Sequence, residues 1–328
     1  RQAGAESCVL LKNNNHALPL DPAAPVALFG RVQKNYFYVG NGSGGDVSAP
    51  YSINLVQGLV NAGVQLDSTV LAAYESWCTA SVNDPDPGFW GHWPRYYAEM
   101  PVKQDWVQAA AKRCQTAVVV IGRSAGEDRE NTLKKGSFYL TNKEKALLDA
   151  VTAAFQKVVL VLNIGSIMDF AEIDAYGDKI SAILLAWQLG MESGNAVADV
   201  LTGQVNPSGR LTDTIAKTYA DYPAQNFGNK AENRYTEDIF VGYRYFETFA
   251  PERVLYPFGY GLSYTDFACQ VKKTEIKNQT VTVQVQVENT GALPGKQVVQ
   301  LYACCPCGAL GKAAKVLIAF GKTEELAP

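Results

Sequence analysis

Four short apolar segments that do not alternate with polar residues constrain the fold of this chain most strongly. Each has the length of a β-strand and is rich in Val, Ile and Leu: residues 26–31, 117–122, 157–162 and 181–187. Strands of this kind are buried on both faces, as in a parallel sheet covered by helices. Stretches with helical spacing lie between them: residues 53–62, 107–114, 142–155 and 194–201. The alternation predicts a doubly wound, mostly parallel α/β sandwich, in which ligands bind beyond the carboxyl ends of the strands.

Two of the predicted helices carry end signals. Thr141 followed by Glu144 is a capping box, which predicts that the third helix begins there. Gly203 is a plausible residue for ending the fourth helix in the left-handed conformation.

The pattern changes after Phe267 and predicts a second domain. Residues 280–287 alternate strictly between apolar and polar, and strand-like segments follow at 297–302 and 314–320. Alternation with intervening turns is typical of an antiparallel β-sandwich. A seven-strand sandwich needs roughly 100 residues and about 60 remain here, so we expect this all-β domain to be truncated.

Charge and hydropathy exclude several classes of function. The 328 residues contain 29 Lys and Arg against 32 Asp and Glu, without a basic run of five. This balance argues against partners such as nucleic acid or an anionic membrane surface. The longest apolar runs are strand-sized, well short of the roughly 18 residues of a membrane-spanning helix. The length itself favours two domains.

The seven cysteines favour a reduced interior, because an odd number in a long chain does not suit a complete disulfide framework. We therefore expect a cytoplasmic location. Cys304 and Cys307 form a C-x-x-C, which suggests redox chemistry or half a zinc site. Neither is favoured, since no second pair accompanies it and the two histidines, His16 and His92, lie far away in sequence. No metal or cofactor is expected.

Two predicted loops carry candidate functional residues. Residues 40–46, Gly-Asn-Gly-Ser-Gly-Gly-Asp, predict a close approach of backbone to ligand, a phosphate cradle or a simple tight turn. They match neither common phosphate-binding motif. The other loop follows the second long strand and contains Glu127, a carboxylate placed where such folds perform chemistry. The alternative is a solvated face in which Glu127, Asp128 and Glu130 pair with Arg123, Arg129 and Lys134.

An irregular aromatic stretch covers residues 74–101. It contains Trp77, Trp90, Trp93, Tyr96 and Tyr97, which could stack on sugar rings. An insertion packed down on the domain is the favoured interpretation.

Several motifs, taken in order, resemble glycoside hydrolase family 3. They are the Gly-Ser-Gly-Gly loop, Ala-Gly-Glu at 125–127, Asn-Pro-Ser-Gly-Arg-Leu at 206–211, Val-Gly-Tyr-Arg-Tyr-Phe at 241–246 and Pro-Phe-Gly-Tyr-Gly-Leu-Ser-Tyr at 257–264. Each fragment alone is weak, but together they are specific and the similarity covers nearly the whole chain.

The resemblance implies a division of the chain and roles for two residues. Residues 1–264 resemble the family's α/β sandwich domain, and residues 265–328 resemble an incomplete fibronectin type III-like domain. The family's nucleophile is an Asp in an (α/β)8-type barrel, which this sequence lacks. By the same comparison Glu127 is the general acid/base, and Ser43 is a substrate-binding residue that hydrogen-bonds the sugar.

The sequence departs from the family pattern at two places. Asn41 stands where Thr is frequent. Asp128 and Arg129 directly follow Glu127, which puts Glu130 at the usual position of an Asp, with an undetermined role. Neither departure touches Glu127 or Ser43.

The function implied is part of a retaining β-glycosidase, most simply a β-glucosidase acting on a β-glucoside or oligosaccharide. We expect the chain alone to be inactive and the pKa of Glu127 to be raised in the complete site. The motifs favour the order in which the barrel follows Pro328. The alternatives are a β-xylosidase or other β-glycosidase of the same family, a carbohydrate-binding accessory module, and a nucleotide-binding flavodoxin-like domain.

Overall fold

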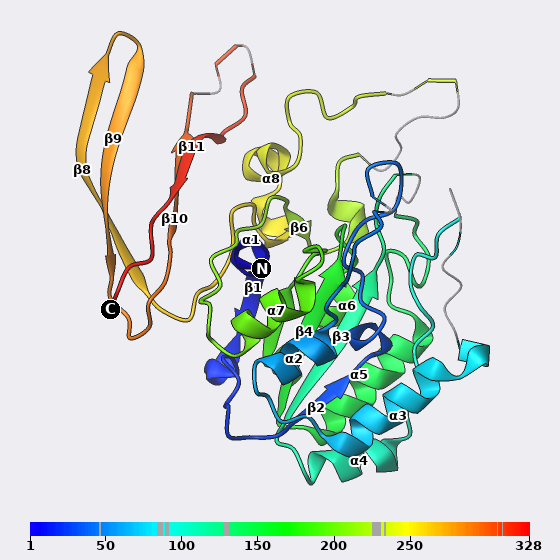
Figure 1. The fold of residues 1–328 in the computed structure, drawn as a ribbon. Helices are drawn as coiled ribbons and strands as arrows, with labels where there is room; N and C mark the ends of the chain where they lie inside the picture. The colour runs from blue at the N-terminus through cyan, green and yellow to red at the C-terminus, as the bar shows by residue number, and fades with distance from the viewer. Residues whose placement is uncertain are drawn as a thin grey trace.

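A five-stranded sheet with strand order β1-β5-β4-β3-β2 forms the centre of the computed structural model (Figure 1). β2 to β5 run parallel, and β1 pairs with β5 in the antiparallel direction. The strands are β1 (Val9–Asn13), β2 (Val26–Phe29), β3 (Thr116–Arg123), β4 (Lys157–Ile164) and β5 (Ala182–Leu185). The structure describes residues 1–45, 47–83, 88, 92–127, 131–224, 231–232, 234–306, 308–309 and 311–328. All four predicted apolar strands are present, and the antiparallel edge strand β1 was not predicted.

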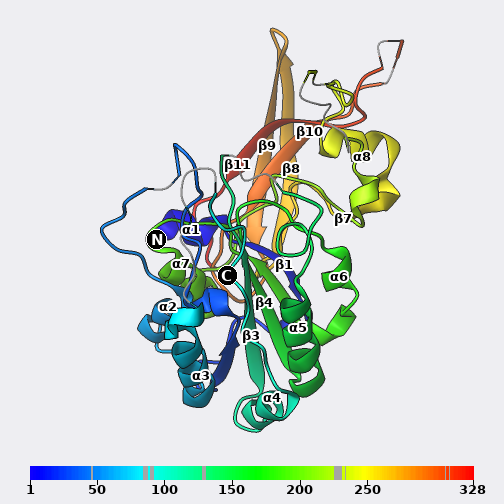
Figure 2. The same cartoon turned by 90° about the vertical axis from the view of Figure 1, so that its right-hand side faces the viewer.

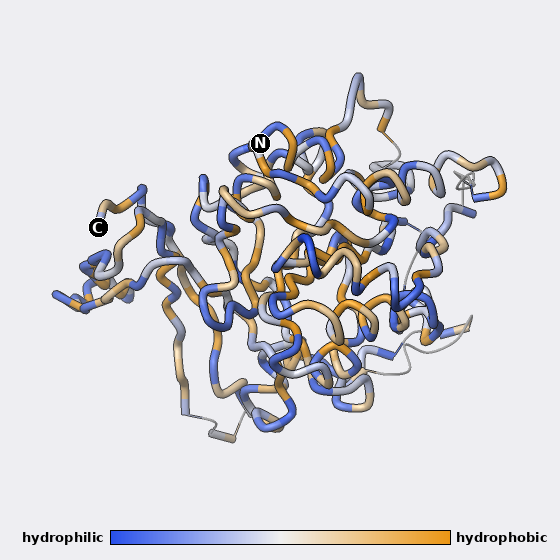
Figure 3. Tube along the Cα trace, turned by 90° about the horizontal axis from the view of Figure 1, so that it is seen from below, coloured by the Kyte–Doolittle hydropathy of each residue, from blue (hydrophilic) through white to orange (hydrophobic). Residues whose placement is uncertain are grey.

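Helices cover both faces of this sheet (Figure 1). One face carries α1 (Gln2–Ser7), α2 (Leu55–Asn61) and α7 (Ser193–Leu201), and the other carries α3 (Ser68–Thr79), α4 (Gln104–Ala111), α5 (Asn142–Ala154) and α6 (Ala171–Asp174). Along β3, Val118 and Val120 belong to one core, whereas Val119 and Ile121 belong to the other. Because both faces are buried, the middle of each parallel strand is a continuous apolar run, as at Ala117–Ile121 and Val158–Leu162. In Figure 3 hydrophobic residues are frequent in the interior of the α/β body.

The predicted helix-end signals are confirmed. Thr141 caps α5, and its side chain accepts a hydrogen bond from the Glu144 amide while the Glu144 carboxylate accepts one from the Thr141 amide. Gly203 follows α7 with φ of 75°, as expected for a left-handed helix terminus.

Short elements connect the main ones. They are α8 (Tyr243–Phe249), β6 (Ile215–Ala216), β7 (Val254–Tyr256) and the 3-10 turns η1 (Asn14–His16), η2 (Arg31–Gln33), η3 (Ser81–Asn83), η4 (Gly177–Lys179), η5 (Tyr219–Asp221) and η6 (Pro251–Arg253). β6 and β7 pair antiparallel. Across the described parts of the chain, no helix is both long and apolar enough to cross a membrane.

The C-terminal region consists of two antiparallel hairpins that project from the α/β body (Figure 2). They are formed by β8 (Phe267–Lys277) with β9 (Thr280–Asn289) and by β10 (Val298–Ala303) with β11 (Val316–Lys322). The three predicted strands are present, and β8 was not predicted. Residues on nearly the whole of β8 are exposed.

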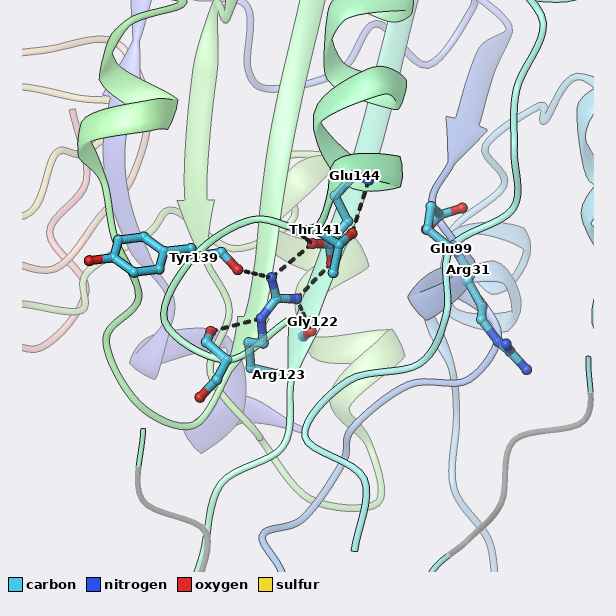
Figure 4. Close-up of polar contacts among 8 residues, drawn as sticks. Arg31, Glu99, Gly122, Arg123, Tyr139, Thr141 and Glu144 are labelled. Atoms are coloured by element: carbon cyan, nitrogen blue, oxygen red, sulfur yellow. Dashed lines mark hydrogen bonds and ion pairs between the residues drawn. The ribbon is translucent and has the colours of Figure 1, made fainter. Parts of the chain in front are cut away.

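The stretch predicted to be irregular begins as a helix, because α3 continues to Thr79. Beyond α3, Trp93 and Tyr97 pack on the α/β core, whereas Tyr96 is exposed. The Tyr97 ring stacks on Phe37, with 4.7 Å between centroids, and Trp93 is buried. The carboxylate of Glu99 accepts bonds from the Arg31 amide and the Tyr74 hydroxyl, and burial raises the pKa of Glu99 to about 7. Figure 4 shows the Arg31 side chain pointing away from this carboxylate. Trp90 lies outside the described residues.

Candidate functional site

The candidate site lies where two neighbouring strands end. β2 and β3 pair in parallel, so the segments after their carboxyl ends lie close together. The glycine-rich segment 40–45 and the segment 125–127 meet there through backbone hydrogen bonds. The Asn41 amide donates to the Ala125 carbonyl at 2.8 Å, and the Glu127 amide donates to the Asn41 carbonyl at 3.2 Å.

These contacts bring the two predicted site residues together. The Ser43 hydroxyl donates to Oε2 of Glu127 at 2.6 Å, and the Ser43 amide donates to the same oxygen at 2.8 Å. Both residues are exposed, so they form an open rim on the surface of this chain. Two donors on one carboxylate oxygen fix the direction in which Glu127 points.

The glycines of this site permit the close backbone approach. Gly126 has φ of 137°, and a Cβ atom there would lie 2.0 Å from the Asn41 carbonyl oxygen. Because the Ser43 amide already donates to a carboxylate, the loop would bring a phosphate against negative charge. This geometry disfavours the phosphate-cradle interpretation.

The pKa of Glu127 is held below its ordinary value in this chain, mainly by the Ser43 hydroxyl and then by the Ser43 amide. This direction is opposite to the one expected for a proton donor in the complete site. Within the described residues, no neighbouring carboxylate contributes to the shift. A depressed pKa means that the Ser43 bonds stabilise the folded loop above the unfolded pKa of Glu127, and that this stabilisation is lost as pH falls through the folded pKa.

We expect Ser43→Ala to raise the pKa of Glu127 toward the ordinary value, because only the backbone donor remains. Carboxyl ¹³C NMR of glutamate-labelled chain, titrated with acid, measures this pKa directly. Ser52→Ala, at an exposed serine in the same connection between β2 and α2, is the matched control. An unchanged Glu127 titration in Ser43→Ala would show that the hydroxyl does not hold the carboxylate.

Arg123 does not pair with Glu127, so the solvated-face interpretation is wrong for this arginine. Its side chain is buried and forms an ion pair with Glu144 at 2.6 Å (Figure 4). The unbroken run of charges around residue 127 suggested a surface, but the final residue of β3 lies under the loop. Asp128, Arg129 and Glu130 lie outside the described residues.

Sequence analysis missed Asn163, a residue of β4 that connects this strand to two loops at the same end of the sheet. Its side chain is fully buried, accepts from the Phe37 amide at 2.8 Å and donates to the carbonyls of Phe37 and Trp187. A polar residue that directly follows the apolar run of β4 is the signal that would have indicated it.

The described part of the chain offers no group of three His, Cys, Asp or Glu side chains that could hold a metal ion. Cys304 and Cys305 are free and exposed. Cys307, the other half of the C-x-x-C, lies outside the described residues.

Known proteins are similar to this chain in sequence and in fold. Residues 8–264 match the profile of the Glycosyl hydrolase family 3 C-terminal domain. A β-glucosidase of Ruminococcus albus is 45% identical over 330 residues, which is 100% of this chain and 34% of that protein.

Solved structures agree. A β-glucosidase from Paenibacillus barengoltzii superposes with a TM-score of 0.96 at 44% identity, covering 99% of this chain and 36% of that one. β-Glucosidase 3B from Thermotoga neapolitana, in complex with glucose, has a TM-score of 0.89 at 37% identity, covering 99% and 46%.

The chain thus spans less than half the length of each of these relatives. The match covers the five-stranded sheet, both helical layers and the loops that carry Ser43 and Glu127. The chain belongs to glycoside hydrolase family 3, as an α/β sandwich followed by a fibronectin type III-like region.

Proposed function

We propose that this chain supplies the general acid/base, Glu127, and a sugar-binding residue, Ser43, to a retaining β-glucosidase. The nucleophilic Asp belongs to a barrel domain outside this chain. The observation that carries the proposal is the Ser43–Glu127 contact, a carboxylate held in one direction at an exposed rim beyond the strand ends. The β-glucosidase relatives and the glucose complex of a homologue support glucose as the sugar.

The mechanism needs a second carboxylate. In retaining glycosidases two carboxyl groups lie about 5–5.5 Å apart, one attacking the anomeric carbon and the other protonating the leaving oxygen. Glu127 performs the protonation and then removes a proton from the water that hydrolyses the glycosyl-enzyme. A nucleophile from another domain must therefore approach the rim, which explains why the rim is open in this chain.

Substrate binding can reverse the direction in which the pKa of Glu127 is shifted. If the Ser43 hydroxyl donates its hydrogen bond to a sugar oxygen instead of Glu127, the main cause of the lowered pKa is lost. The approaching nucleophile and the exclusion of water raise the pKa further, since both disfavour the carboxylate. Glu127 is then protonated when the leaving group requires a proton.

The same proposal divides the chain at residue 264. Residues 1–264 form the α/β sandwich domain and residues 265–328 an incomplete fibronectin type III-like domain. The end of the family match at 264 and the change from parallel sheet to antiparallel hairpins support this boundary. A chain with the acid/base alone does not turn over a glycoside.

Aryl glycoside hydrolysis by the full-length protein tests the function. We expect release of glucose from an aryl β-glucoside, with β-glucose as the first product observed by ¹H NMR, because two displacements retain configuration. The chain alone should release none. Faster turnover of the matched xyloside would show that xylose, and not glucose, is the preferred sugar. α-Glucose as the first product would contradict the retaining mechanism. Binding without turnover by the full-length protein would instead indicate an accessory module.

A further inference from the structure

The Arg123 guanidinium connects both ends of the loop that carries Glu127. Arg123 is the last residue of β3, and its side chain is only 2% exposed. Nε donates to the Ser137 carbonyl at 3.0 Å and one terminal nitrogen donates to the Tyr139 carbonyl at 3.2 Å. The other terminal nitrogen donates to the Gly122 carbonyl at 2.7 Å. The guanidinium therefore bonds backbone just before the loop, at Gly122, and within the last residues of the loop, at Ser137 and Tyr139.

Glu144 fixes the guanidinium in turn. Its two carboxylate oxygens accept one bond each from the terminal nitrogens, at 2.6 and 2.8 Å (Figure 4). Glu144 belongs to the first turn of α5, and one of its oxygens also accepts from the Thr141 amide. The planar fork of an arginine suits this arrangement, and a lysine ammonium does not reproduce it.

The aromatic stretch supports the start of the same loop. The Ser124 amide donates to the Arg95 carbonyl at 2.8 Å, and the Tyr96 ring lies over the Arg123 guanidinium, 5.9 Å from centroid to Cζ. Glu127 itself follows three residues after Ser124 and is exposed. Both ends of the loop are thus anchored while its functional carboxylate faces outward.

We infer that Arg123, with Glu144, is a positioning residue for Glu127. The buried pair fixes the position of the loop relative to the sheet, so that the Glu127 carboxyl lies within hydrogen-bonding distance of the leaving-group oxygen. The positioning role rests on the proposed function of Glu127 as the acid/base. The anchoring of the loop is independent of that proposal. Burying an ion pair this deeply has a desolvation cost, and we infer that this pair defines the geometry of the loop.

Arg123→Lys in the full-length protein tests the inference, because it keeps the charge and removes the fork. We expect kcat/KM to fall by about tenfold or more for an alkyl glucoside, whose leaving group needs protonation, since a small misplacement of a catalytic group is costly. For a dinitrophenyl glucoside, which needs no proton, the loss should stay below about twofold. A variant that merely lowered the folded fraction would reduce both equally.

Arg113→Lys is the matched control. Arg113 lies near the other end of β3 and also forks onto a buried carboxylate, with Nε and one terminal nitrogen 2.6 and 3.0 Å from the Asp67 oxygens. Arg113→Lys should leave the ratio of kcat/KM for the two glucosides unchanged.

Hydrogen exchange of the backbone amides at 124, 127 and 136–139 provides a readout that does not depend on activity. Each of these amides is hydrogen-bonded, and Arg123→Lys should accelerate their exchange while Arg113→Lys does not. Unchanged exchange, or equal losses on the two glucosides, would overturn the positioning role. If the full-length wild type proved inactive on both glucosides, the proposed function would fail. Hydrogen exchange would still show whether Arg123 anchors the loop.

Discussion

Glu127→Ala is expected to lower kcat/KM of the full-length protein for an alkyl glucoside by about 10²–10⁴-fold, the usual contribution of a general acid. The alkoxide is a poor leaving group and departs only with a proton, which the alanine variant does not supply. For a dinitrophenyl glucoside, kcat/KM should change little, because this leaving group departs as a stable anion. Steady-state rates with both substrates measure the difference.

Azide gives the second half of this prediction. With the dinitrophenyl glucoside, the variant forms the glycosyl-enzyme but lacks the base that activates water, so kcat should fall. Azide attacks without losing a proton, so it should restore kcat and yield β-glucosyl azide, detectable by NMR. Glu275→Ala, at an exposed carboxylate on β8, is the control and should behave as wild type. Wild-type turnover of the alkyl glucoside by Glu127→Ala would eliminate the proposed role.

The parallel strands could be predicted from the sequence because burial on both faces requires a run of consecutive apolar residues. Every residue of 117–121 is apolar, since alternate side chains enter different cores. β1 has no long apolar run of this kind. It is five residues long, ends in Lys12 and Asn13, and pairs with β5 about 170 residues away. α3 was missed because Tyr74 and Trp77, which pack on the core, were grouped with the aromatic residues that follow.

The sequence nominates Ser43 and Glu127 as site residues, but it does not predict the contact between them. Ser43 and Glu127 were indicated by resemblance, while their hydrogen bond depends on β2 and β3 being neighbours in the sheet. The partner of Arg123 is Glu144, on the following helix, although Glu127, Asp128 and Glu130 follow Arg123 much more closely in sequence. Local charge patterning describes a surface, whereas the ion pair here is set by how α5 packs beside β3.

Gly42→Ala is expected to reduce the activity of the full-length protein by about 10²-fold with the fold intact, because about 1 Å of misplacement at a catalytic group can cost this much. Gly42 has φ of 103°, and a Cβ atom there would lie 2.3 Å from Cβ of Glu127. Either the glycine loop or Glu127 must move, and the two Ser43 bonds to the carboxylate cannot both persist.

Gly44→Ala is the matched control within the same loop. A Cβ atom at Gly44 has no neighbour within 4 Å and no left-handed backbone to strain. Activity should stay within about twofold of wild type, since the change leaves the geometry of Glu127 alone. Both positions lie in the loop after β2, with Gly42 buried against Glu127 and Gly44 exposed, so only Gly42→Ala should lower the thermal unfolding midpoint. Equal activities of the two alanine variants would show that the contact between the glycine loop and Glu127 does not set the position of the acid/base.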